Sequence, residues 1–169
     1  MGFIDSEPFK ALKRSAKSMW IKFSPNPSSP RDFVESIGIR HPGYCKYASS
    51  PVATVTNTAV VSKSNFTCTY RSLPTCEDCL VYTVDSINTN NALHIMNITN
   101  PTTIHEVKQY RAVYLMAKET TVKASKLEHF MKQARCLGFT WEPDFYYNPK
   151  NTFCEKGVEH EDVHVHNND

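Results

Sequence analysis

The chain has 169 residues, and 40% of them are hydrophobic, which suits one domain with a single substantial core. The formal net charge is +2, and no block of lysine and arginine stands out, which argues against a nucleic-acid-binding protein. The sequence contains no run of about 18 apolar residues, so no transmembrane helix is predicted. Its first residues also lack the basic and apolar regions of a signal peptide.

Cysteines and glycosylation sequons nevertheless point to an extracellular protein. The six cysteines are dispersed along the chain, and their spacing does not match a zinc-binding module. Open N-glycosylation sequons begin at Asn65 and Asn97. Together these features favour a secreted, disulfide-bonded glycoprotein.

Hydrophobic alternation and turn residues predict a series of strands. Residues 6–17 are expected to form a short helix that begins at Ser6. Strands are then expected at 19–23, 33–39, 44–55, 59–70, 80–84, 92–96 and 110–118. Turns rich in proline, asparagine and serine separate them, which favours an antiparallel meander.

The strongest helix signal follows the last strand. Its apolar residues recur at the spacing of one helix face, and they are Leu127, Phe130, Met131, Ala134 and Leu137. Ser125 and Glu128 have the spacing of a capping box, and Gly138 is expected to end the helix. The sequence therefore predicts an all-β protein, an up-and-down antiparallel barrel with one C-terminal helix packed outside. We expect one domain over residues 1–155 and a disordered polar, histidine-containing tail over 156–169.

Two further motifs have chemical alternatives. Cys76-Glu77-Asp78-Cys79 has the spacing of a redox dithiol, but a strand is predicted after it where a reactive dithiol needs a helix. A structural disulfide is therefore favoured. The tail histidines His160 and His164 suggest metal binding, but a disordered tail is the favoured interpretation and no metal site is predicted. No nucleophile–base signature occurs, so neither enzymatic activity nor a cofactor is predicted.

The order of these elements resembles that of the lipocalins. The resemblance covers most of residues 2–157, and it includes the strand end Tyr-Leu-Met-Ala-Lys and the helix Leu-Glu-His-Phe-Met-Lys-Gln-Ala-Arg-Cys-Leu-Gly-Phe. Its most specific parts are residues 73–80 and 142–154. Within the family, the chain is most similar to the fish plasma proteins that bind saxitoxin, tetrodotoxin or tributyltin. Alpha-1-acid glycoprotein looks like a more distant relative.

The N-terminus departs from the family pattern. A lipocalin opens with a Gly-x-Trp strand, whereas residues 2–9 resemble the segment that follows that strand. The resemblance therefore implies a chain without the signal peptide and the first strand, with a barrel of seven strands where the family has eight. Lys118 would replace a basic residue that stacks on the missing tryptophan, and a solvated lysine is the favoured interpretation.

The resemblance also bears on the disulfides. It implies a bond between Cys45 and Cys154. Cys136 matches a helix cysteine whose family partner is absent here, so it is expected to be free or re-paired. A local bond between Cys76 and Cys79 and a cross-strand bond from Cys68 both remain open.

Finally, the resemblance implies a small-molecule site inside the barrel, where alternate residues of each strand point. The inward-facing candidates are Tyr70, Leu80, Tyr82, Val84, His94, Met96, Arg111, Val113 and Leu115. Arg111 could meet an anionic group of a ligand, and Asp78 and Asp85 are the nearby acids for a cationic one. The alternative is that these residues close a filled core.

The expected function is that of a secreted plasma carrier, a monomer without nucleic-acid or membrane partners. Its ligand would be a small, mostly hydrophobic toxin or xenobiotic, such as an organotin or a guanidinium alkaloid. The alternative is an incomplete barrel without a ligand, acting as an interaction protein or a truncated form.

Overall fold

The computed structural model describes residues 1–55, 58–63, 66–87 and 109–155. These residues form β1 (Gly2–Asp5), α1 (Glu7–Ser15), β2 (Ser18–Asn26), β3 (Ser29–His41), β4 (Tyr44–Val55), β5 (Thr58–Lys63), β6 (Phe66–Leu73), β7 (Cys79–Ile87), β8 (Gln109–Ala117) and α3 (Ala124–Cys136). Neither described helix is long and apolar enough to cross a membrane.

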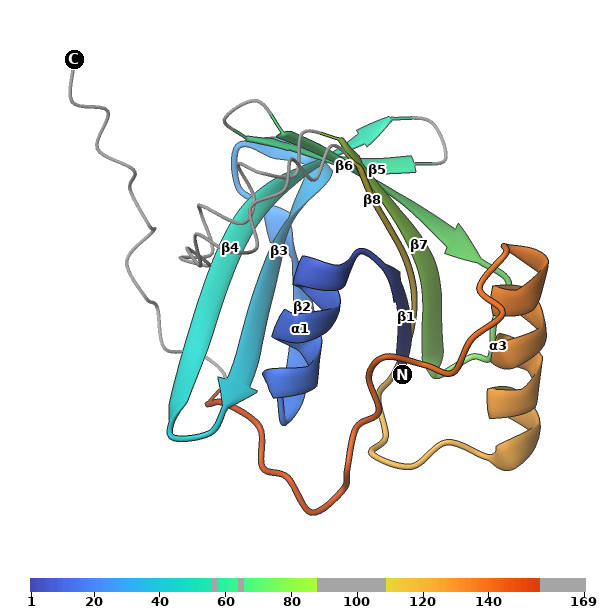
Figure 1. The fold of residues 1–169 in the computed structure, drawn as a ribbon. Helices are drawn as coiled ribbons and strands as arrows, with labels where there is room; N and C mark the ends of the chain where they lie inside the picture. Colours follow the sequence, from blue (N-terminus) through green and yellow to red (C-terminus); the bar gives the residue numbers. More distant parts are fainter. Residues whose placement is uncertain (56–57, 64–65, 88–108, 156–169) are drawn as a thin grey trace.

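All eight described strands form one antiparallel sheet, which curls into a half-barrel (Figure 1). Its strand order is β1-β8-β7-β6-β5-β4-β3-β2, so each strand from β2 to β8 lies beside its neighbour in sequence. Between β3 and β4, Gly43 takes a φ of 83°, a left-handed conformation that glycine adopts without steric cost. The predicted all-β class and antiparallel arrangement are therefore confirmed.

The first strand requires a correction. Residues 2–5 form β1, which pairs with β8 from Gly2 opposite Tyr114 to Asp5 opposite Arg111. Phe3 and Ile4 are fully buried on opposite faces of this strand, which explains why so short a segment is held in the sheet. The prediction that the first strand of the sheet is the one at residues 19–23 is thus wrong.

Two other predicted strands also need comment. The predicted strand 59–70 is two strands, β5 and β6, which pair as an antiparallel hairpin. The predicted strand at 92–96 lies outside the described residues. The described sheet therefore has eight strands, because β1 adds one strand and because residues 59–70 form two strands instead of one.

The predicted N-terminal helix is present as α1, and it lies between the two edges of the sheet (Figure 1). On one side, the ring of Phe9 stacks on Tyr110 of β8 with 4.3 Å between centroids. On the other side, Ser15 Oγ lies 3.1 Å from Nδ1 of His41, the last residue of β3. The helix thus bridges the edges where β1 and β2 end the sheet.

Helix α3 packs on the outer face of the sheet (Figure 1). Its buried residues Phe130 and Ala134 belong to an apolar cluster with Phe3 of β1, which supports the predicted apolar face. Gly138 takes a φ of 92°, and the next N–H, of Phe139, donates to the Ala134 carbonyl. This is the helix end that the sequence predicts.

The predicted capping box of α3 is wrong. The helix begins at Ala124, the N-cap residue is Lys123, and no side chain caps it. Ser125 therefore lies inside the first turn, where its side chain cannot take the N-cap role. Glu128 instead forms an ion pair with Lys132, with 2.9 Å between Oε1 and Nζ.

The segment after α3 runs from β1 across to β4. Near β1, the carboxylate of Asp144 accepts a hydrogen bond from the Ile4 N–H at 2.9 Å. At the far end, the Trp20 indole donates to the carbonyl of Cys154 at 3.0 Å. Cys154 is bonded to Cys45 on β4, the pairing that the resemblance implied. This segment and α1 therefore each connect the two sides of the sheet.

The remaining cysteines divide into one local bond and two thiols. The structure joins Cys76 to Cys79, and it leaves Cys68 and Cys136 as free thiols. Lys118 is exposed and lies near Asp78, with 3.3 Å between Nζ and Oδ1.

Candidate functional site

The register of the sheet decides which side chains face its concave side. Residues opposite one another on antiparallel strands share a face. Tyr70 lies opposite Val84, Tyr82 opposite Tyr114, and Leu80 opposite Met116. The predicted Tyr70, Leu80, Tyr82 and Val84 are thus brought together. Because α3 covers the other face of β7 and β8, their shared face is the concave, inner one.

Three predicted inward residues lie on the outer face instead. Val113 and Leu115 are buried in the apolar cluster with α3. Arg111 lies near the outward carboxylate of Asp85, with 3.7 Å between Nε and Oδ1. The predicted orientation of these three is wrong because both faces of β8 are buried, so alternation alone does not identify the inner one. Predicted residues His94 and Met96 lie outside the described residues.

The inner face is lined by tyrosines. The rings of Tyr70 and Tyr82 are 6.0 Å apart between centroids, and those of Tyr82 and Tyr114 are 5.5 Å apart. The hydroxyl groups of Tyr110 and Tyr114 are hydrogen-bonded to each other. Since α1 adds Phe9 beside Tyr110, the result is a continuous aromatic wall. We call Tyr70, Tyr82, Tyr110 and Tyr114 the tyrosine wall.

A carboxyl group faces this wall from β3. Glu35 is only 5% exposed, and its Oε2 lies 3.5 Å from the Tyr70 hydroxyl, which donates to it. Sequence analysis missed Glu35, although the alternation of Phe33, Glu35 and Ile37 carries the signal. Glu35 is thus the acidic residue that faces inward from the described strands.

The acids considered from the sequence lie elsewhere. Asp78 is exposed in the turn before β7, near Lys118. Asp85 faces outward, where its Oδ2 accepts a hydrogen bond from Arg71 at 2.8 Å. Both are therefore occupied by surface ion pairs outside the concave face. A cationic ligand group on that face would meet Glu35 instead.

Burial controls the ionisation of the inner face. It raises the pKa of each phenol in the tyrosine wall above the ordinary value, because a phenolate would lose its hydration there. The same cause raises the pKa of the Cys68 thiol, which pairs across the sheet with Ser86. At neutral pH the inner face therefore presents neutral phenols and a protonated thiol.

These shifts predict how the protein responds to alkali. An unfolded tyrosine ionises near pH 10, whereas the phenols of the wall stay protonated in the folded state. Their contribution to stability is therefore complete below about pH 10 and is lost as the pH rises toward their higher native pKa values. We expect tyrosinate absorbance to show four of the eight tyrosines ionising only when the protein unfolds. Titration of all eight near pH 10, with the fold intact, would contradict this.

The described residues contain no candidate metal site. None of their His, Cys, Asp and Glu side chains form a group of three or more that could hold a metal ion. What the inner face offers instead is aromatic surface, hydroxyl groups and one carboxyl group. These groups can surround a small molecule and hydrogen-bond a polar part of it.

Comparison with known proteins identifies the fold. No protein-family model matches the chain, and no curated protein sequence matches it. Among solved structures, the chain is similar to a siderocalin with dual ligand specificities, with a TM-score of 0.61 and 13% identity over 82% of each chain. It is also similar to a dog lipocalin allergen, with a TM-score of 0.57 and 13% identity over 81% of this chain and 80% of that one.

A deswapped triple mutant of bovine odorant-binding protein gives a TM-score of 0.53 at 13% identity, over 81% of this chain and 80% of that one. At such low identity these likenesses concern the backbone arrangement alone. They agree with the curled antiparallel sheet and its outer C-terminal helix. The chain therefore has the lipocalin fold.

Proposed function

We propose that this protein is a carrier that binds one small, mostly hydrophobic molecule against the concave face of its sheet. The observation that carries the proposal is the buried carboxyl group of Glu35 beside the tyrosine wall. Aromatic walls with few polar groups are typical of small-molecule sites. Support also comes from fold neighbours whose names describe ligand binding, a siderocalin and an odorant-binding protein.

The chemistry of the inner face favours one of the two ligand classes suggested by sequence resemblance. A guanidinium group would pair with the Glu35 carboxylate, and the rings of Tyr82 and Tyr114 would offer it cation–π contacts. A thiolate would be the strongest protein ligand for an organotin, but burial raises the pKa of the Cys68 thiol and keeps it protonated. We therefore propose a guanidinium alkaloid as the ligand rather than an organotin.

An alternative function rests on the seam of the sheet. Because β1 and β2 are the two edge strands, the sheet is not closed by strand pairing in the described part of the chain. An open barrel without a ligand would suit an interaction protein. The seam is nevertheless bridged, since α1 contacts β8 and β3 and Asp144 bonds Ile4. This bridging favours the carrier.

The proposal also places the protein outside the cell, as a monomer with glycans on Asn65 and Asn97. Both asparagines lie outside the described residues. The disulfides Cys45–Cys154 and Cys76–Cys79 support this location, because such bonds persist in oxidising compartments.

Fluorescence titration with the apolar probe N-phenyl-1-naphthylamine tests the proposal. We expect saturable uptake of one probe per chain, followed by displacement with tetrodotoxin and weaker displacement with tributyltin. The displacement should be accompanied by a higher melting temperature in the presence of tetrodotoxin, because a ligand that binds only the folded state stabilises it. Weak, non-saturating probe uptake would instead indicate an open sheet and overturn the carrier function.

A further inference from the structure

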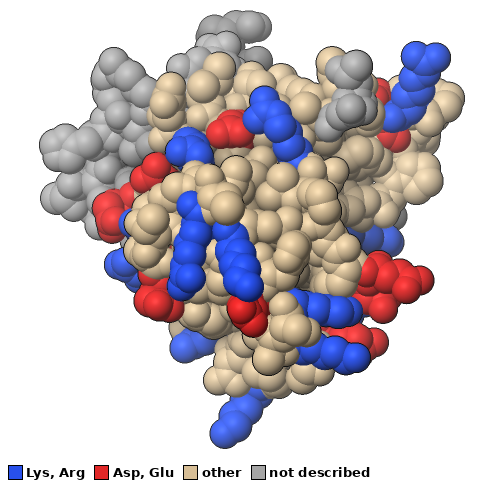
Figure 2. Space-filling model, turned by 90° about the vertical axis from the view of Figure 1, so that its right-hand side faces the viewer, with Lys and Arg blue, Asp and Glu red and all other residues tan. Residues whose placement is uncertain are grey.

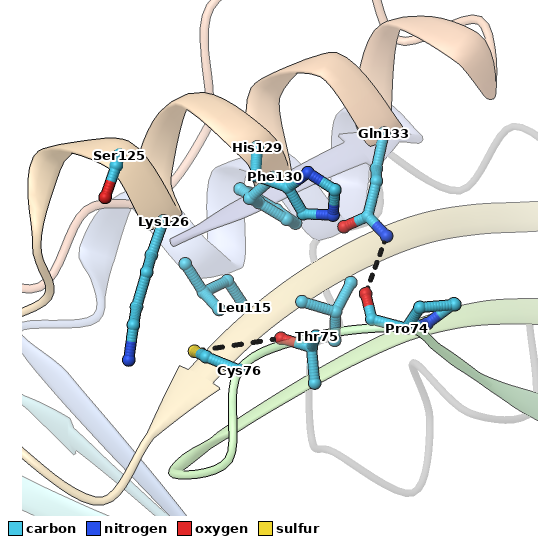
Figure 3. Close-up of a pocket in the computed structure, with 10 residues that line it drawn as sticks. Pro74, Thr75, Cys76, Leu115, Ser125, Lys126, His129, Phe130 and Gln133 are labelled. Atoms are coloured by element: carbon cyan, nitrogen blue, oxygen red, sulfur yellow. Dashed lines mark hydrogen bonds between the residues drawn. The ribbon is translucent and has the colours of Figure 1, made fainter.

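A pocket lies outside the sheet, between α3 and the segment that joins β6 to β7 (Figure 3). Its volume is about 300 Å³. The floor is apolar and consists of Val81, Leu115 and Phe130. A hydrogen bond of 2.8 Å from Gln133 Nε2 to the Pro74 carbonyl ties the helix to the opposite wall. The pocket therefore has a fixed width at that end.

Charge and hydrogen bonding differ between the two ends of this pocket. Figure 3 shows Lys126 at one end and Gln133 at the other, with His129 between them. No described acid forms an ion pair with Lys126, whereas Lys132 on the same helix is paired with Glu128. Gln133 Oε1 is buried and accepts no hydrogen bond from the described residues. One end thus offers a positive charge and the other an unused acceptor.

The overall charge of the surrounding surface does not explain the difference between the two ends of the pocket. Basic and acidic side chains are interspersed over the face that carries α3 (Figure 2). This face therefore has no general positive charge that would attract an anion to the pocket. The local arrangement of Lys126 above an apolar floor would do so, because the pocket lining contains no acidic residue.

We propose that this pocket is a second binding site, which takes a small aromatic hydroxycarboxylate. The carboxylate would meet Lys126, the ring would cover the floor of Val81, Leu115 and Phe130, and the hydroxyl group would donate to Gln133 Oε1. The length is suitable, because Gln133 lies seven positions after Lys126 in the helix, which is about 10 Å along the axis. A lysine side chain and an elongated ligand together span that distance.

NMR titration of the whole protein with 4-hydroxybenzoate tests the site. A ligand of ten non-hydrogen atoms in an open pocket is expected to bind with a dissociation constant on the order of 1 mM. Lys126→Gln should weaken binding about fivefold, because the partly exposed ion pair is lost. The matched control Lys132→Gln should change it less than about twofold, since Lys132 does not line the pocket.

Two further comparisons distinguish binding in this pocket from binding at the concave face and from nonspecific attraction of an anion by positive charge. The neutral analogue 4-hydroxybenzamide should bind equally well to the Lys126→Gln variant and to the wild type. Thr75→Trp, at the exposed rim, should block the pocket, whereas Glu35→Gln should leave 4-hydroxybenzoate binding unchanged. Equal losses for the two lysine variants, or binding that survives Thr75→Trp, would overturn the site.

Discussion

Replacing both Cys45 and Cys154 by alanine is expected to lower the free energy of unfolding by about 5 kcal/mol. The bond joins residues separated by 109 positions, so it restricts the unfolded chain over most of its described length. In the folded state it also anchors the segment that bonds to Trp20 and to Ile4. Urea unfolding of the oxidised wild type and the double variant measures the difference.

The bond between Cys76 and Cys79 provides a matched control. It joins residues only three positions apart, so its removal by two alanine substitutions should cost about 2 kcal/mol under the same chain-entropy treatment. The long bond should therefore be the more important one by about 3 kcal/mol. Equal destabilisation by the two double variants would show that restriction of the unfolded chain does not explain the stability.

The order of strands and the outer helix could be predicted because their signals are local. The face of α3 is visible as apolar residues at helical spacing, and Phe130 and Ala134 are indeed buried. Its end at Gly138 is visible because glycine adopts a positive φ without cost. The start was not predicted correctly, since Ser125 lies one residue inside the helix and the cap depends on how the chain arrives there.

The first strand could not be predicted, because its signal comes from its partner. Gly2–Asp5 is four residues long, and pairing with β8 stabilises it together with the burial of Phe3 and Ile4. Isolated from that partner, so short a segment has no periodicity to measure. The family pattern at this place was also absent, which made a missing strand the natural interpretation.

The candidate site was predicted only in part, for a related reason. Tyr70, Tyr82 and Val84 were placed on one face correctly, but β8 has apolar residues on both faces. Only the position of α3 shows that Val113 faces outward and Tyr114 inward. Glu35 could have been placed by its alternation on β3, but its approach to Tyr70 depends on the curl of the sheet.

The Glu35 carboxyl group gives the second large expected effect. If it pairs with a guanidinium group on the concave face, the Glu35→Gln substitution removes the charge while it keeps the shape. Removal of one partner of a buried charged hydrogen bond typically costs at least 2 kcal/mol, which corresponds to a loss of affinity of about 30-fold. Asp85→Asn is the control, because Asp85 is an acid on the outer face of the same sheet.

The most direct measurement is calorimetric titration of the wild type, the Glu35→Gln variant and the Asp85→Asn variant with tetrodotoxin. The carrier function predicts one site per chain, an affinity at least about 30-fold weaker for Glu35→Gln, and an unchanged affinity for Asp85→Asn. Urea unfolding of the same samples shows whether each variant is folded. Tetrodotoxin binding that is equally tight in a folded Glu35→Gln variant would contradict the assignment of the ligand to the concave face beside Glu35.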